Sequence, residues 1–78
     1  MSKLRDISGK KLVLVFEKFG FVIVGQKGSH IKMSKLSNKI EILVIPSHSS
    51  IAKGTLKAIY TQALAYIPES DLKRIFYS

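Results

Sequence analysis

Residues 21–33 read FVIVGQKGSHIKM, and the conformation of this stretch decides the fold. Phe21 to Val24 is aromatic and β-branched, which favours a strand. The segment GQKG, Gly25 to Gly28, predicts a turn because glycine is common where the backbone reverses. His30 to Ser34 then returns as a second strand. Alternation gives this strand a core face with Ile31 and Met33, and a polar face with His30, Lys32 and Ser34.

A helix is predicted before this hairpin, from Gly9 to Phe19. Ser8 can cap its first turn, and Gly20 can end it. Its apolar side chains repeat on one face: Leu12, Val15, Phe16 and Phe19. Three lysines lie off that face: Lys10, Lys11 and Lys18.

After the hairpin, a turn at Lys35 to Lys39 leads to a third strand, Ile40 to Ile45, which Pro46 ends. A loop, Pro46 to Gly54, precedes a helix from Thr55 to Ala65. In that helix the apolar side chains recur at helical spacing: Leu56, Ile59, Tyr60 and Ala63. Pro68 can begin a short last helix, Pro68 to Phe76. The predicted fold is α+β, in the order α-β-β-β-α, with a three-stranded antiparallel sheet packed on two helices and a short extra C-terminal helix.

The composition is that of one globular domain, residues 1–78. Hydrophobic residues make up 46% of the chain and charged residues 23%. The chain has no cysteine, which excludes a disulfide framework and a thiolate metal site. The N-terminal MSKLRDISGKK is too polar for a signal peptide, and no apolar run approaches the ~20 residues that span a bilayer. We therefore expect a soluble cytoplasmic protein without a membrane partner.

Charge gives the first indication of function. Thirteen Lys and Arg residues against five Asp and Glu leave a formal net charge of +8. Such an excess in a short chain favours polyanionic partners. Arg5 and Arg74 are the two arginines, and lysine suits sequence-independent phosphate contact better than bidentate reading of bases. A basic surface that serves only solubility is the alternative.

Two glycine-loop motifs match parts of the chain. A phosphate-binding P-loop is excluded for Gly20 to Lys27, because Gln26 stands where the lysine should be and the intervening residues are strand-like. The KH module, which clamps single-stranded nucleic acid with a GXXG loop, matches Gly25 to Gly28. That loop joins two helices, however, and the β-branched residues before Gly25 are poor helix formers.

Four longer motifs match another family. They are FGF (Phe19 to Phe21), QKGSH (Gln26 to His30), IPSH (Ile45 to His48) and KGTLKAIYTQA (Lys53 to Ala63). With these motifs in order, the chain from Ile7 to Phe76 resembles the HicA family, small toxins of bacterial and archaeal toxin–antitoxin pairs. Two positions depart from the family pattern: Ile31 and Lys32 follow the histidine where many relatives have a second histidine or an aromatic residue, and Leu64 replaces a glycine.

This resemblance implies a double-stranded-RNA-binding-like α-β-β-β-α fold and a ribosome-independent endoribonuclease that cleaves mRNA. It also implies a HicB-type antitoxin as partner. The essential histidine of the family, in its G-S-H motif, falls on His30.

The chemistry of the residues fits this role. A histidine can accept and donate a proton near neutral pH, so His30 is the candidate general acid and base for attack by the 2′-hydroxyl of RNA. Lys27 and Lys32 can bind the phosphate, and the backbone around Gly28 and Ser29 can form an anion nest. This chemistry needs no metal and no small-molecule cofactor, and the sequence has no cluster with metal-ligand spacing.

Other candidates are less specific. Lys53 opens the second long helix, where free N–H groups favour a phosphate, and Lys57 lies nearby. The role of His48 in the serine-rich loop stays open. Two other functions also stay open: a non-catalytic RNA-binding module, KH-like or double-stranded-RNA-binding-like, and an interaction protein whose basic face serves only a protein partner.

Overall fold

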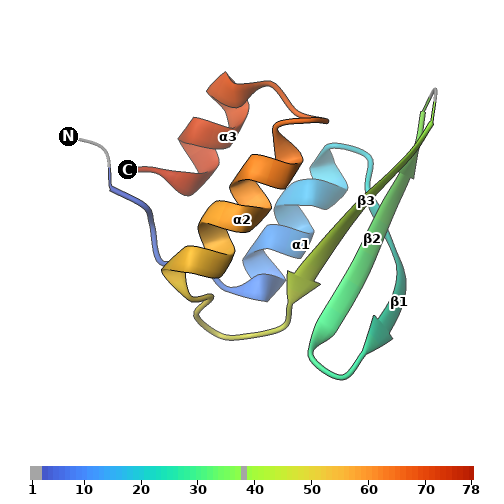
Figure 1. The fold of residues 1–78 in the computed structure, drawn as a ribbon, viewed down its shortest axis with the longest axis horizontal. Coiled ribbons are helices and arrows are strands. Elements are labelled where there is room, and N and C mark those ends of the chain that lie inside the picture. Colours follow the sequence, from blue (N-terminus) through green and yellow to red (C-terminus); the bar gives the residue numbers. More distant parts are fainter. Residues whose placement is uncertain (1–2, 38) are drawn as a thin grey trace.

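The computed structural model describes residues 3–37 and 39–78 and has the predicted order of elements (Figure 1). The elements are α1 (Gly9–Lys18), β1 (Val22–Lys27), β2 (His30–Leu36), β3 (Ile40–Pro46), α2 (Lys53–Ala63) and α3 (Glu69–Phe76). The strands form one antiparallel sheet in the order β1-β2-β3. The α+β fold predicted from the sequence is therefore confirmed, including the short terminal helix.

The helices lie on one side of the sheet. Figure 1 shows α1 and α2 next to the sheet, with α3 packed beside α2 on the side away from the strands. The buried side chains of both layers form one core, and its fully buried members include Leu12, Phe16, Met33, Leu43 and Leu56. The predicted faces of β2 are confirmed, because Ile31 and Met33 are buried while His30 and Lys32 are exposed.

The predicted turn at Gly25 to Gly28 is wrong in its position. Gly25, Gln26 and Lys27 belong to β1 and pair with Lys32, Ile31 and His30. The reversal takes only Gly28 and Ser29. Gly28 has a φ of 58°, a left-handed conformation that glycine adopts without steric cost, and a glycine in the first position is the signature of a tight two-residue hairpin turn.

β1 contains a bulge that the sequence did not predict. Ile23 pairs with Met33 and Gly25 pairs with Lys32, so Val24 is an extra residue without a partner on β2. A bulge changes which face the following side chains occupy. β1 is also the open edge of the sheet, and all six of its residues are exposed.

Smaller differences concern the ends of elements. β2 continues to Leu36, which shortens the predicted turn at Lys35 to Lys39, and Asn38 of that turn lies outside the described residues. α2 begins and ends two residues earlier than predicted, because the Ala52 carbonyl already accepts a hydrogen bond from the Leu56 amide. The Ser8 cap is confirmed, since its side chain accepts a hydrogen bond from the Lys11 amide.

The two ends of the described chain lie side by side (Figure 1). Leu4 forms an isolated antiparallel bridge with Tyr77, and the Arg5 amide donates to the Phe76 carbonyl at 2.7 Å. These bonds fix α3 and the N-terminal segment to each other. Over the described residues, the helices are too short and too polar to traverse a bilayer.

Candidate functional site

Three of the predicted site residues line one groove on the face of the sheet away from the helices. Lys27, His30 and Lys32 surround a depression of about 350 Å³, here called the His30 groove. The rest of its lining is Gly25, Gln26 and Val44. His30 begins β2 and is exposed, so a ligand can reach its imidazole without a conformational change.

The bulge at Val24 explains why Lys27 belongs to this groove. Residues that pair across an antiparallel ladder share a face, and Lys27 pairs with His30. Ile23 pairs with buried Met33 and lies on the core face. Strict alternation from Ile23 would place Lys27 on the core face as well. The extra residue shifts the alternation by one, and Lys27 therefore lies beside His30.

Hydrogen bonds fix the backbone next to His30. The Gln26 Nε2 donates to the Gly28 carbonyl at 3.1 Å, across the two-residue turn. The Ser47 amide donates to the Ser29 carbonyl at 2.6 Å, which ties the β1–β2 turn to the loop after β3. His30 itself pairs with Pro46 at the end of β3. The backbone at His30 is therefore fixed by β1 on one side and by the end of β3 on the other.

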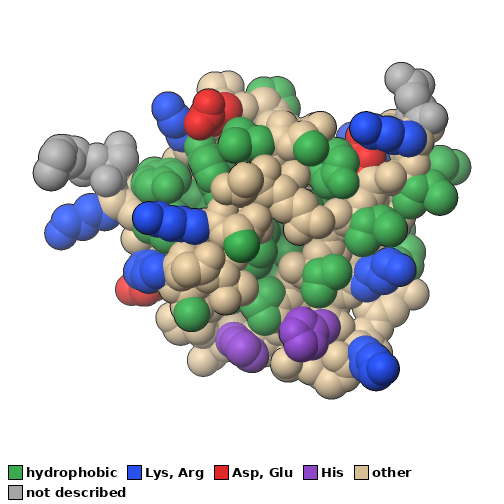
Figure 2. Space-filling view, viewed as in Figure 1, with side chains coloured by type: hydrophobic (Ala, Val, Ile, Leu, Met, Phe, Trp, Pro, Cys, Tyr) green, Lys and Arg blue, Asp and Glu red, His purple; other side chains and the backbone are tan. Residues whose placement is uncertain are grey.

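The second histidine lines a different groove. His48 lies with Lys10, Leu14 and Ile23 around a depression of about 520 Å³ between α1, β1 and the loop after β3, here called the α1–β1 groove. Its walls are mainly apolar, and Leu14 and Ile23 are 51% and 50% exposed. Figure 2 shows both histidines at the same end of the molecule, with Lys or Arg side chains beside one of them. The two histidines thus share an end of the fold but not a groove.

Lys53 and Lys57 are not brought to the His30 groove. Lys53 opens α2, and its Nζ donates to the Leu4 carbonyl at 2.9 Å and to Asp6 Oδ1 at 3.0 Å. That ammonium holds the N-terminal segment against α2. Lys57 is exposed one turn further along the helix. Phosphate binding at these two lysines stays a prediction, as does an anion nest at Gly28 and Ser29.

The charge around the His30 groove is positive. Its lining contains two lysines and no carboxylate. In residues 3–37 and 39–78, no three His, Cys, Asp or Glu side chains are grouped so that they could hold a metal ion. The arrangement can therefore bind an anion and transfer a proton next to it.

Comparison with known families found a match for this chain. The family model described as "HicA toxin of bacterial toxin-antitoxin" matches residues 9–64, which is most of the chain. The chain belongs to the HicA toxin family. Comparisons with curated proteins and with solved structures found no match.

The match to HicA toxins covers α1 to the end of α2 and includes both histidines. It makes this chain a toxin of a toxin–antitoxin pair, which implies an antitoxin as partner. α3 and residues 3–8 lie outside the matched range. The helix and the segment that pair at the two ends of the chain are thus not covered by this match.

The sequence predicts Lys27, His30 and Lys32 as site residues but not the other residues that line the His30 groove. The sequence patterns predict a turn at Gly25 and Gln26 and an apolar strand at Val44, and neither pattern indicates that these residues line a groove. One signal was present for the first two: a Gly-Ser pair between strand-like segments predicts a two-residue turn and extends β1 to Lys27.

Proposed function

We propose that this HicA-family protein is a ribosome-independent mRNA endoribonuclease in which His30 is the general acid and base. The observation that supports this role is the shared groove of His30, Lys27 and Lys32 on the open face of the sheet. An exposed histidine between two cations suits a phosphodiester substrate. We further propose that it acts in the cytoplasm, where mRNA is found.

The proposed reaction uses the 2′-hydroxyl of the RNA as nucleophile. His30 takes the proton of this hydroxyl while its oxygen attacks the neighbouring phosphorus. The bond from phosphorus to the 5′-oxygen breaks, and the leaving oxygen receives a proton from the imidazolium. The products are a 2′,3′-cyclic phosphate and a 5′-hydroxyl. One histidine serves both transfers in turn, because imidazole accepts and donates protons near neutral pH.

Lys27 and Lys32 stabilise the charge that develops on the phosphorane. They flank His30, one on the paired strand and one two residues along β2. Cations placed where charge develops in the transition state account for a large share of enzymatic rate enhancement. We propose no step that needs a metal ion or a cofactor.

The test is cleavage of single-stranded RNA by purified protein in the presence of EDTA. We expect scission by the wild type and a loss of roughly 10²–10⁴-fold in His30→Ala, the usual contribution of a general acid–base group. His48→Ala is the matched control and should retain most of the activity. RNA with 2′-deoxy residues should not be cut. Cleavage by a correctly folded His30→Ala variant at the wild-type rate would remove His30 from the mechanism.

The fold distinguishes between the two forms of the alternative function, a non-catalytic RNA-binding module that is KH-like or double-stranded-RNA-binding-like. A KH module requires a helix after the glycine loop, whereas β2 begins at His30. The KH fold is therefore contradicted. A non-catalytic module of the double-stranded-RNA-binding type remains as the competing proposal, and it predicts salt-sensitive binding of RNA without any strand scission in the same assay.

We also propose a HicB-type antitoxin as the inhibitory partner. The α1–β1 groove adjoins the histidine end of the fold and is mainly apolar, which suits a protein surface better than an RNA backbone. A partner seated there can extend over the β1–β2 turn to His30. Its contact surface should be acidic where it meets Lys27 and Lys32.

A further inference from the structure

A second basic groove lies between α1 and α3, on the helical side of the molecule. Its volume is about 290 Å³, and it is here called the α1–α3 groove. Four cationic side chains line it: Arg5, Lys11, Lys18 and Arg74. No Asp or Glu belongs to its lining. These four residues are nearly a third of the Lys and Arg in the chain, gathered around one small depression.

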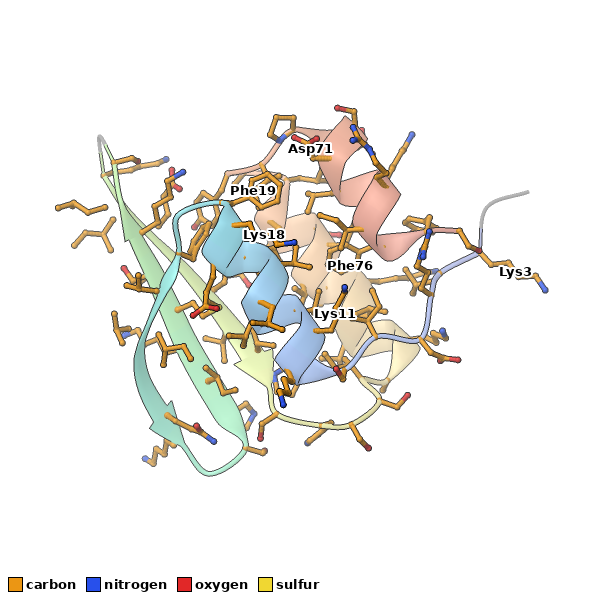
Figure 3. All side chains as sticks on the ribbon, turned by 180° about the vertical axis from the view of Figure 1, so that it is seen from behind. Lys3, Lys11, Lys18, Phe19, Asp71 and Phe76 are labelled. Atoms are coloured by element: carbon orange, nitrogen blue, oxygen red, sulfur yellow. The ribbon has the colours of Figure 1, made fainter. Side chains whose placement is uncertain are left out.

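Most of this charge is not neutralised by the protein. Of the four cations, one forms an ion pair within the described residues: Arg74 Nη2 lies 3.4 Å from Asp71 Oδ1. Figure 3 shows Lys11 and Lys18 on α1, with Phe19 at the end of that helix and Asp71 on α3. Grouping four like charges costs repulsion, which an anionic ligand would relieve.

Arg5 is held in place for such a ligand. Its amide donates to the Phe76 carbonyl at 2.7 Å, and its Nε donates to the Tyr77 carbonyl at 2.9 Å. The guanidinium keeps its two terminal nitrogens as further donors. A pre-positioned arginine loses little conformational entropy when it binds a phosphate.

The apolar part of the groove lining suits a nucleic acid. It is formed by Val15, Phe19 and Ile75. Phe19 is half-buried, so part of its ring is accessible. Aromatic and apolar surface beside a line of cations is the usual arrangement in proteins that bind single strands.

The α1–α3 groove follows α1, and α1 begins at the histidine end of the fold. α1 begins there, because the Gly9 amide donates to the His48 carbonyl at 2.8 Å. Lys11 lies in the first turn of α1 and Lys18 in the last, about 10 Å apart along the axis at 1.5 Å per residue. A linear polyanion that leaves the histidine end along α1 would therefore meet Lys11 and then Lys18.

We infer that the α1–α3 groove binds backbone phosphates of the same RNA strand that is cut at the His30 groove. This inference rests on the proposed function. Arg5, Arg74 and Ile75 lie outside the range that the HicA family model matches. The groove thus combines α1 residues inside the matched range with residues from the two ends of this chain, and it lets a long RNA bind more tightly than the His30 groove alone allows.

The test compares two double variants that both lower the net charge from +8 to +6. Lys11→Gln with Lys18→Gln removes two cations of the groove. Lys3→Gln with Lys39→Gln removes two exposed cations that do not line it. The probe is a long 2′-O-methylated RNA, which cannot be cut through the 2′-hydroxyl, and binding is followed by fluorescence anisotropy over a range of salt concentrations.

We expect RNA binding by the Lys11→Gln, Lys18→Gln variant to depend less on salt than binding by wild type. The slope of the logarithm of the association constant against the logarithm of the salt concentration should be smaller in magnitude by about 1.4, or about 0.7 for each lost phosphate contact on a single strand. The control variant should keep the wild-type slope. An equal change in both variants would mean that only total charge matters, and no change in either would mean that RNA avoids the groove. Both results would overturn the inference. It would also be overturned if the groove variant lost binding to the antitoxin while its RNA binding stayed unchanged.

Cleavage kinetics separate this inference from the proposed function. The groove variant should cut a long RNA with a lower kcat/KM than wild type and cut a dinucleotide, which reaches only the His30 groove, at the wild-type rate. Equal rates on long RNA would overturn the α1–α3 groove and leave His30 catalysis intact. If wild type cuts neither substrate, the proposed function fails, while the anisotropy measurement still tests the groove.

Discussion

Gly9 lies where the first turn of α1 approaches the end of β3, and no side chain fits there. A Cβ at this position would overlap the Pro46 carbonyl oxygen and come within 3.0 Å of the Ser47 Cα. These contacts are with backbone, which cannot rotate aside. The close approach also lets the Gly9 amide donate to the His48 carbonyl. The absence of a side chain at Gly9 thus lets α1 approach the loop that borders both histidines.

Gly9→Ala should therefore destabilise the protein by about 1–3 kcal/mol, the usual cost of forcing an extra methyl into a packed site. Gly54→Ala is the matched control. Gly54 lies in the first turn of α2, and nothing lies within 4 Å of its would-be Cβ. This change should stabilise by about 0.4–1 kcal/mol through the unfolded chain. Urea unfolding measures both, and equal effects of the two substitutions would contradict the close approach.

The role of Gly9 was not predictable from its local sequence. The pattern from Ser8 onward predicts the start of a helix, and the structure confirms that start. Whether a glycine there is needed depends on a strand that is more than 25 residues away in sequence. Local rules describe caps and periodicity, and they contain no information on how closely two elements approach.

At the scale of elements, the β1–β2 hairpin shows which part of the site sequence reasoning can reach. Alternation in β2 correctly placed His30 and Lys32 on one face, because that strand is regular and half-buried. β1 is an exposed edge strand, where no buried face imposes a register. Its bulge at Val24 therefore left no hydrophobic pattern to detect, although it brings Lys27 to His30.

Tyr60 connects α2 with α3. Tyr60 on α2 is buried, and its hydroxyl donates to Glu69 Oε2 at 2.9 Å in the first turn of α3. Its ring also packs edge-on against Phe76 and Tyr77. Burial raises the pKa of the Tyr60 phenol above its ordinary value of 10.0, and the hydrogen bond to the Glu69 carboxylate raises that pKa further.

This raised pKa predicts the response of stability to alkali. The neutral phenol is favoured in the folded state, so its contribution to the free energy of unfolding is complete below pH 10. That contribution is lost as the pH rises above 10 through the folded-state pKa. We expect the free energy of unfolding to fall less steeply with rising pH above 10 in Tyr60→Phe than in wild type.

Glu69→Gln separates the two causes of the shift. It keeps an acceptor for the phenol but removes the negative charge, so the pKa of Tyr60 should fall and still exceed 10.0, because burial is the larger cause. Tyrosinate absorbance, taken as the difference between each protein and its Tyr60→Phe counterpart, gives the pKa directly. A Tyr60 that ionises at or below the ordinary value would contradict the buried phenol.

For the whole molecule, the two basic grooves belong to different layers of the fold. The His30 groove is lined by residues of the sheet, and the α1–α3 groove is lined by residues of the helices and by Arg5. The apolar α1–β1 groove lies at the histidine end between them. An inhibitor that covers the apolar groove and the β1–β2 turn would block the chemistry. It would leave the α1–α3 groove free to hold RNA.

Association with an acidic antitoxin should accordingly depend on charge at the His30 groove. Lys27→Glu with Lys32→Glu should slow the association rate with a cognate HicB-type protein roughly tenfold at low salt, because steering by opposite charges is lost. The difference should shrink as salt screens the charges. Lys3→Glu with Lys39→Glu changes the net charge equally at exposed sites outside the groove. Stopped-flow mixing of each variant with the partner measures the rates.

Inhibition by this partner should also cover His30. In the free protein the His30 side chain is exposed and should react readily with diethylpyrocarbonate. In the complex that modification should be suppressed together with RNA cleavage, because both need access to the imidazole. Mass spectrometry of the modified peptides separates His30 from His48. A stable complex in which His30 still reacts and RNA is still cut would show that the antitoxin does not act by occluding the groove.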